Sequence, residues 1–220
     1  MPTVVITGAN RGIGLALAQE YSKQHWQVIA LCRATSAELA ATGAQVITGL
    51  DLKNLQGLAQ IVQELKHQNV DVLINNAGIL GREHLGDLDT ASITEQFIVN
   101  ALAPIKVAEA FLPLLNPGAK VAFITSRMGS IADNTSGGFY GYRMSKAALN
   151  AAAKSFSEDV KSKQIAVGIL HPGYVQTAMV NFGGDISAEV CAGRLVQRIA
   201  DLNIGNTGSF WHSNGDLLPW

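Results

Sequence analysis

The chain has 220 residues, of which 48% are hydrophobic and 15% are charged, and its formal net charge at pH 7 is −1. This composition is typical of a folded globular protein and excludes an intrinsically disordered chain. The balanced charge and the absence of a basic run argue against nucleic-acid binding. No apolar run reaches the roughly 18 residues of a membrane span, and the first apolar strand leaves no room for a signal peptide. We therefore expect one cytoplasmic domain over residues 1–220.

The cysteines and histidines do not have the spacing of a metal site. Cys32 and Cys191 lie outside any Cys-x-x-Cys pair, which favours reduced structural thiols over a disulfide or a metal site. The five histidines show no paired spacing of metal ligands, so we expect no metal.

The N-terminal region predicts a strand, a glycine-rich turn, a helix and a second strand. The strands and the helix are expected at residues 3–7, 15–24 and 27–32. In the turn, Gly8 permits a tight bend, Gly12 lets the backbone approach a phosphate, and Gly14 lets the helix pack closely on the strand. The spacing is G-x-x-x-G-x-G rather than the commoner G-x-G-x-x-G. This context favours nucleotide binding over a plain loop.

The end of the second strand indicates which nucleotide binds. Dinucleotide folds often place an acid here that binds the ribose 2′-hydroxyl of NAD. This chain carries Cys32 and Arg33 at that point, and Arg11 lies in the glycine-rich turn. Two charge-assisted hydrogen bonds to a 2′-phosphate, each worth about 1.5–3 kcal/mol, would favour NADP over NAD by roughly a hundredfold or more. The alternative is that both arginines are simply solvated.

Further strands alternate with amphipathic helices along the rest of the chain. Strands are expected at residues 44–48, 70–74, 120–125, 165–170 and 208–212, and helices at 54–67, 90–115, 142–163 and 187–202. This alternation predicts an α/β Rossmann fold, a doubly wound parallel sheet of seven strands with helices on both faces. Ligands of such sheets bind at the carboxyl ends of the strands, where Gly8, Arg33, Asp51 and Asn76 fall. For Asp51 and Asn76, turn chemistry is the alternative.

One long helix contains two residues that disturb its pattern. The helix at residues 90–115 is expected to bend near Pro104, and it carries Asn100 in its apolar first half. A buried amide must find hydrogen-bond partners, so Asn100 either stabilises the bend or serves the site.

The stretch from Tyr142 to Lys146 carries the strongest catalytic signal. The Ala-rich run after it favours a helix, so the two side chains lie on one face, about 6 Å apart along the axis. We expect the Lys146 ammonium to lower the pKa of the Tyr142 phenol from about 10, so that the phenol can exchange a proton with an alcohol or a carbonyl. Because an isolated Tyr-x-x-x-Lys pair often arises by chance, the rest of the chain decides its meaning.

Taken together, the motifs resemble those of the short-chain dehydrogenase/reductase family over nearly the whole chain. In the order of that family, the chain carries Thr7-Gly8-x-x-x-Gly12-x-Gly14, Asn75-Asn76-Ala77-Gly78, Asn100, Ser126, Tyr142-x-x-x-Lys146, and Pro172-Gly173 through Thr177. The Arg-Met-Gly-Ser loop after Ser126, the Tyr-Arg-Met-Ser-Lys stretch and the ending Leu218-Pro219-Trp220 are most similar to the C-factor/sniffer-like carbonyl reductase branch.

The resemblance implies catalytic roles for four residues. Tyr142 is expected to be the general acid/base, Lys146 to lower its pKa and bind the nicotinamide ribose, and Ser126 to hydrogen-bond the substrate oxygen. Asn100 is expected to hold the helix bend and a water that relays protons to Lys146. The gap of 16 residues between Ser126 and Tyr142 is longer than is usual in the family, so Ser130 is the alternative serine.

The resemblance also implies a cofactor site. Asp51 and Leu52 are expected beside the adenine, and residues 76–78 beside its ribose. Val175 and Thr177 are expected at the nicotinamide amide. The full set of predicted cofactor-binding residues is Gly8, Asn10, Arg11, Gly12, Ile13, Gly14, Arg33, Asp51, Leu52, Asn76, Ala77, Gly78, Tyr142, Lys146, Pro172, Gly173, Val175 and Thr177.

The function implied by the resemblance is hydride transfer between NADP(H) and a carbonyl or secondary alcohol, in the direction of carbonyl reduction. NAD(H) is the alternative cofactor, and the substrate is expected to be a small-molecule carbonyl or alcohol. Residues 178–186 are the expected lid, in which Met179, Val180 and Phe182 either form an apolar substrate wall or pack on the core. His171 is expected to be structural rather than to face the nicotinamide.

By analogy with the family, we expect a homodimer or homotetramer formed through the helices that carry Asn100 and Tyr142. Two other functions compete with the enzyme. A non-enzymatic NADP(H)-binding signalling or regulatory protein on the same fold would be expected to lose Tyr142 or Lys146, and this chain keeps both. A nucleotide-sugar epimerase or dehydratase would be much longer and would carry a G-x-x-G-x-x-G turn.

Overall fold

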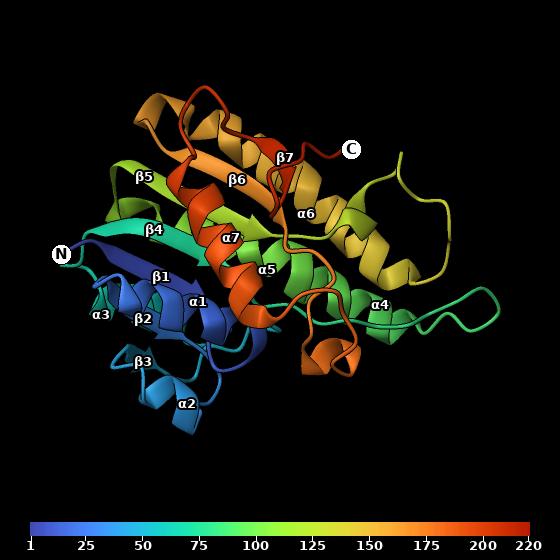
Figure 1. Cartoon of the computed structure of the whole chain (residues 1–220), viewed down its shortest axis with the longest axis horizontal. Coiled ribbons are helices and arrows are strands. Elements are labelled where there is room, and N and C mark those ends of the chain that lie inside the picture. Colours follow the sequence, from blue (N-terminus) through green and yellow to red (C-terminus); the bar gives the residue numbers. More distant parts are fainter.

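The computed structural model describes residues 1–220, and all seven strands belong to one sheet (Figure 1). The strand order is β3-β2-β1-β4-β5-β6-β7, and every neighbouring pair is parallel. The order reverses between β1 and β4, and ligands of open α/β sheets bind at such a reversal. The predicted doubly wound Rossmann fold is confirmed. The strands are β1 (Thr3–Thr7), β2 (Gln27–Leu31), β3 (Gln45–Ile47), β4 (Val70–Asn75), β5 (Leu115–Ile124), β6 (Ala166–His171) and β7 (Ser209–His212).

Helices cover both faces of the sheet (Figure 1). Helices α1 and α7 pack on one face, and α3, α5 and α6 pack on the other. The helices are α1 (Gly12–Lys23), α2 (Ala37–Ala40), α3 (Leu58–Glu64), α4 (Thr90–Phe97), α5 (Ala103–Phe111), α6 (Tyr140–Asp159) and α7 (Ala188–Ala200).

Alternate residues of the strands contribute to two separate cores. Val4 and Ile6 of β1 pack with Leu17 of α1 and Leu195 of α7, whereas Val5 packs with side chains of α3, α5 and α6. All five side chains are fully buried, and each contributes about 1.5–3 kcal/mol to stability. Because both faces of the sheet are covered, its strands are continuously apolar, which is why the sequence predicts them well.

The helix expected at residues 90–115 is interrupted. Helix α4 ends at Phe97, a π-helical turn covers Ile98–Leu102, and α5 begins at Ala103. The distortion is therefore centred on Asn100, about one helical turn before Pro104 and close to the predicted bend. Pro104 has no N–H group to donate to the preceding turn, which agrees with a disturbed helix at this point.

The same region bears on the membrane prediction. The helix Thr90–Leu114 has 25 residues, and an 18-residue window of it has a mean hydropathy of 1.5, so by length and composition alone it could cross a membrane. Half of its most apolar window is buried inside the fold. Val107, Ala108 and Phe111 are fully buried against the sheet. This burial accounts for the apolar composition, as it does in core helices of globular domains.

Several boundaries follow local turn geometry that the sequence pattern does not reveal. Helix α2 was not predicted, and its first turn is capped by Ser36, whose Oγ accepts a hydrogen bond from Leu39 N at 3.1 Å. Helix α3 starts only at Leu58, after Gly57 with φ 84°. Helix α6 begins at Tyr140, two residues before the predicted start.

Candidate active site

The glycine-rich turn between β1 and α1 is shaped to receive an anion. Gly8 and Gly12 have φ values of 68° and 54°, which glycine adopts without strain. Helix α1 begins at Gly12, its N-cap residue Arg11 makes no side-chain capping bond, and its first turn contains no acidic residue. The first N–H groups of α1 and the positive end of its dipole are therefore available to a phosphate. The donor set fits the pyrophosphate of a dinucleotide.

The segment after β4 fixes this turn. Asn76 Nδ2 donates to the carbonyl oxygens of Thr7 and Gly8 at 3.0 and 3.3 Å. In return, Thr7 Oγ1 accepts hydrogen bonds from the backbone N–H groups of Asn76 and Ala77 at 3.0 and 3.2 Å. A Cβ atom on Gly8 would lie 2.9 Å from the Ala77 Cα. The Asn76 amide thus serves the turn, in agreement with the turn-chemistry alternative, and a contact of residues 76–78 with the ribose stays a prediction.

Two unpaired cations lie near the expected position of the adenine ribose. Arg33 follows the carboxyl end of β2, Arg11 precedes α1, and both side chains are exposed. Neither forms an ion pair within the chain. Cys32 is buried, and Asp51 uses Oδ1 to accept a hydrogen bond from the N–H group of Lys53 at 3.0 Å. The chain therefore offers positive charge here, as the sequence predicts.

The fold brings Tyr142, Lys146 and Ser126 together. Lys146 Nζ lies 5.8 Å from the ring centroid of Tyr142, one helical turn along α6, and donates to the carbonyl oxygen of Ile124 at 2.9 Å. Ser126 follows the carboxyl end of β5, is buried, and lies close enough to the Tyr142 hydroxyl to influence its pKa. Its Oγ also accepts a hydrogen bond from Met128 N at 3.1 Å.

The alternative serine has a different environment. Ser130 is buried, and its Oγ accepts a hydrogen bond from Asp133 N at 3.1 Å. This bond shapes the loop after β5 and does not involve Tyr142. The geometry therefore favours Ser126 over Ser130 as the serine beside the phenol.

Burial sets the protonation of the two groups on α6. Burial raises the pKa of Tyr142 to about 12, although the nearby Ser126 hydroxyl lowers it in part. Burial also lowers the pKa of Lys146 to about 8. The sequence predicted a lowered Tyr142 pKa, and the structure differs because removal from water disfavours the charged phenolate. Tyr142 is thus a protonated donor at neutral pH.

Asn100 joins the π turn, the segment after β4 and α6. Its Nδ2 donates to Ile79 O at 2.8 Å and to Ser145 Oγ at 3.0 Å, and its Oδ1 accepts from Ile79 N at 2.8 Å. Ser145 Oγ in turn donates to the carbonyl oxygen of Tyr142 at 2.8 Å. A Cβ atom on Gly78 would lie 3.1 Å from Asn100 Oδ1. Of the two roles left open by the sequence, these bonds agree with support of the helix distortion, and a role of Asn100 in the site stays a prediction.

The segment after β6 approaches the glycine-rich turn. A Cβ atom on Gly12 would lie 3.4 Å from Thr177 Cγ2, so Thr177 stands beside the start of α1. Val175 is buried in the core between the sheet and α7, which leaves its backbone rather than its side chain for a nicotinamide contact. Pro172 O accepts a hydrogen bond from Ser213 Oγ at 2.8 Å, and Gly173 has φ 99°.

The expected lid and His171 can also be placed. Met179 and Phe182 have 43% and 70% of their surface exposed, so they do not belong to the core and are free to form a substrate wall. The His171 ring packs edge-on against His212 with centroids 4.8 Å apart. Burial lowers the pKa of His171 to about 3, and His212, the next cause, lowers it further. A neutral, packed ring agrees with the structural role expected for His171.

Sequence reasoning missed two residues, Arg143 and Glu83, that link the start of α6 to neighbouring segments. Arg143 donates to the carbonyl oxygens of Gly138 and Met128 at 3.2 and 3.4 Å, and so ties the loop before α6 to the helix. The only feature of the sequence that could have indicated this role of Arg143 is its position next to Tyr142. Glu83, in the connection between β4 and α4, is buried against the start of α6. Nothing in its sequence context distinguished it from an exposed acid.

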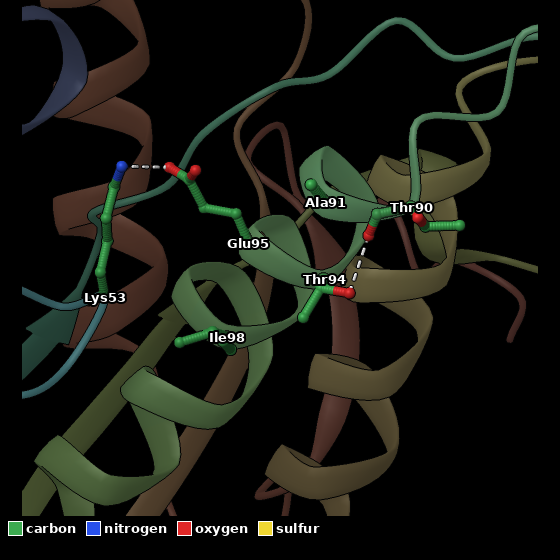
Figure 2. A pocket seen from close by; sticks show the side chains of 6 residues that line it. All are labelled: Lys53, Thr90, Ala91, Thr94, Glu95 and Ile98. Atoms are coloured by element: carbon green, nitrogen blue, oxygen red, sulfur yellow. Dashed lines mark hydrogen bonds and ion pairs between the residues drawn. The ribbon is translucent and has the colours of Figure 1, made fainter.

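One surface cavity lies away from these residues. It has a volume of about 490 Å³ and is bordered by an ion pair between Lys53 and Glu95 at 2.7 Å (Figure 2). Thr94 Oγ1 donates to Thr90 O at 2.8 Å on the same helix. The cavity contains none of the predicted catalytic residues, so it is not the site of the chemistry.

Comparisons with known proteins agree with this geometry. The family model of the short chain dehydrogenases matches residues 2–185. A 1-hydroxy-2-glutathionyl-2-methyl-3-butene dehydrogenase of Rhodococcus sp. (strain AD45) is 38% identical over 226 residues, covering 100% of both chains. The C-signal protein of Myxococcus xanthus is 46% identical over 154 residues, covering 69% of this chain and 93% of its own.

Solved structures show the same relationship. The carbonyl reductase Sniffer of D. melanogaster superposes with a TM-score of 0.91 at 31% identity, covering 100% of both chains. An NADPH-bound carbonyl reductase from chicken fatty liver superposes with a TM-score of 0.89 at 28% identity, covering 100% of this chain and 99% of its own. These relatives include the C-factor and sniffer-like proteins that the motifs resemble. The chain therefore belongs to the short-chain dehydrogenase/reductase family of oxidoreductases.

Proposed function

We propose that the protein is an NADP(H)-dependent carbonyl reductase that uses Tyr142 as its proton donor. The observation that carries this proposal is the position of a half-buried, protonated Tyr142 beside the buried Ser126 and Lys146. All three lie where β5 and α6 meet the carboxyl edge of the sheet, the edge that also carries the uncapped start of α1. Proton donor and anion site thus lie along one edge of one sheet.

Each catalytic residue has a distinct task. Tyr142 and Ser126 donate hydrogen bonds to the substrate oxygen, where negative charge develops as the carbonyl is reduced. Lys146 lies beside the phenol and, with a pKa near 8, can replace its proton. Asn100 holds the backbone of Tyr142 through Ser145. When bound, the reduced nicotinamide supplies the hydride.

The protonation of Tyr142 suits carbonyl reduction. With its pKa raised to about 12, the phenol is fully protonated at neutral pH. A protonated phenol can donate to a carbonyl oxygen, whereas oxidation of an alcohol needs the phenolate. At neutral pH the phenol is therefore in the form that catalyses reduction, which supports the proposed direction.

Arg33 and Arg11 support NADP(H) as the preferred cofactor, with NAD(H) as the weaker one. Both guanidinium groups are exposed and unpaired, so binding a 2′-phosphate would break no existing ion pair. The chicken carbonyl reductase with the same fold was solved with NADPH. The Rhodococcus relative is named as a dehydrogenase of a hydroxylated glutathione conjugate, which makes bulky hydroxy or carbonyl compounds the first candidates for substrate.

The broader predictions fit this function. The single sheet supports one domain over residues 1–220. Phe97 and Leu102 expose 47% and 48% of their surface around the π turn, which supports a homodimer or homotetramer formed through this helical face. The likeness to C-signal keeps a signalling role as the second candidate, but the intact Tyr142 and Lys146 favour the enzyme.

The test is NADPH oxidation by the purified protein against a panel of aldehydes, ketones and diketones. Tyr142→Phe removes the donated proton and keeps the ring, so we expect kcat to fall at least about a hundredfold while NADPH binds as tightly as before. Turnover that survives in Tyr142→Phe would remove this residue from the mechanism. NADPH binding without turnover of any carbonyl would favour the signalling role.

A further inference from the structure

Glu83 is a buried carboxylate without a counter-charge. It lies in the connection between β4 and α4, and only 6% of its surface is exposed. No lysine or arginine forms an ion pair with it. A buried charge normally neutralises itself or finds a partner, so this one requires an explanation.

Three hydrogen-bond donors replace the missing cation. Glu83 Oε1 accepts from Ser92 Oγ at 2.5 Å and from Gln96 Nε2 at 2.7 Å, and Glu83 Oε2 accepts from Gly141 N at 3.3 Å. Burial alone would raise the pKa of Glu83, but these hydrogen bonds outweigh it and the net shift is downward. Gln96 Nε2 and Gly141 N can act only as donors, and they bind the two different carboxyl oxygens, so the site favours an ionised carboxylate.

The third of these bonds reaches the catalytic helix. The residue before α6, Phe139, is in the left-handed region and makes no side-chain cap, and the first turn of α6 contains no acidic residue. Glu83 therefore supplies from another segment the acceptor that an N-cap side chain would normally provide. Its charge also complements the positive end of the long helix.

The cluster around Glu83 fits only because two neighbouring positions, 81 and 141, are glycines without a side chain. A Cβ atom on Gly81 would lie 2.2 Å from both Glu83 Oε1 and Gln96 Nε2. A Cβ atom on Gly141 would lie 2.5 Å from Gln96 Nε2 and 3.1 Å from Glu83 Oε2. Gln96 is itself buried, and its Oε1 accepts from Gly81 N at 2.8 Å. The cluster is thus tightly packed and locks the loop, α4 and α6 together.

The Tyr142 backbone is held from both sides by this arrangement. On one side Glu83 binds the N–H group of Gly141, the residue before Tyr142. On the other side Asn100, through Ser145, binds the carbonyl group of Tyr142 itself. We propose that Glu83 is a positioning residue that sets the Tyr142 hydroxyl against Ser126. This inference rests on the function proposed above.

The test combines Glu83→Gln with a matched control. Glutamine has the same size as glutamate, but its NH₂ group cannot accept a hydrogen bond. At least one donor among Ser92, Gln96 and Gly141 therefore loses its acceptor, and we expect the first turn of α6 to shift. Asp87→Asn makes the equivalent change at an exposed site in the same loop. We expect Glu83→Gln to lower kcat at least tenfold with the Kd of NADPH within twofold of the parent, and Asp87→Asn to change neither. In a Tyr142→Phe background, Glu83→Gln should cause no further loss.

Two measurements keep the outcome decisive. If Glu83→Gln fails to fold, Ser92→Ala provides a substitute test, because it removes only one of the three donors to Glu83. We expect Ser92→Ala to lower kcat by less than the tenfold expected for Glu83→Gln. Hydrogen exchange of the amides at residues 140–143 does not depend on turnover, and Glu83→Gln should accelerate it locally. Faster exchange in a protein that reduces no carbonyl would uphold the positioning and refute only the proposed function. A folded Glu83→Gln with parental kcat, or a loss that persists in the Tyr142→Phe background, would overturn the inference.

Discussion

Replacing Gly14 by alanine tests the packing of the glycine-rich turn. Gly14 lies inside α1, where alanine is intrinsically more favourable than glycine by about 1 kcal/mol. A Cβ atom there, however, would lie 2.2 Å from the Gly8 carbonyl oxygen and 2.5 Å from Asn76 Nδ2. These atoms belong to the backbone of the turn and to the amide that fixes it, so they cannot move aside without disturbing the anion site.

The expected cost exceeds the gain in helix propensity. Overpacking of a well-packed interior costs about 1–3 kcal/mol, and more where backbone must move, so Gly14→Ala should destabilise the protein despite its helical position. For a chain of this size, about 1 kcal/mol corresponds to roughly 2–4 °C in Tm. The affinity for NADPH should fall as well, because the turn that receives the phosphates is displaced.

The chain offers a matched control for this substitution. Gly193 lies in α7, is exposed, and has no atom within 4 Å of the point that a Cβ atom would occupy. Gly193→Ala should therefore raise stability by about 0.5–1 kcal/mol and leave NADPH affinity unchanged. Thermal unfolding and a fluorescence titration with NADPH measure both quantities. If Gly14→Ala were as stable as Gly193→Ala, the close approach of α1 to the turn would be refuted.

Two further predictions concern charge. Arg33→Asp should move cofactor preference from NADPH toward NADH by roughly a hundredfold, because it replaces attraction to the 2′-phosphate by repulsion, and equal Kd ratios in mutant and parent would show that Arg33 does not read the phosphate. The pKa of His171 is lowered to about 3 from an unfolded value of about 6.5, so stability is complete above pH 6.5 and is lost as the pH falls toward 3, by about 2 kcal/mol at pH 5. His171→Gln should remove this part of the acid sensitivity in thermal unfolding between pH 7 and 5, whereas His67→Gln, at an exposed position, should retain it.

The sequence determined the fold and the edge at which the site lies. Strands buried on both faces are continuously apolar, and their alternation with amphipathic helices leaves few arrangements other than a doubly wound parallel sheet. Such a sheet places the ends of its strands on one edge, so the glycine-rich turn, Ser126 and the Tyr142 helix could be assigned to a common region. The spacing of Tyr142 and Lys146 also predicted correctly that the two side chains share a face of α6.

Tertiary structure alone decided the properties that depend on burial and on contacts between distant segments. Spacing shows that Lys146 lies near Tyr142, but only the depth of the site shows that desolvation raises the phenol pKa to about 12. Asn100 was recognisable as a buried amide, whereas the π turn around it depends on its bonds to Ile79 and Ser145. Glu83 had no signal at all, because an acid in a loop is normally solvated and its donors come from α4 and α6. The pKa of a group and the position of its side chain depend on all its neighbours in space. Many of these neighbours are distant in the sequence, so the residue order does not reveal them.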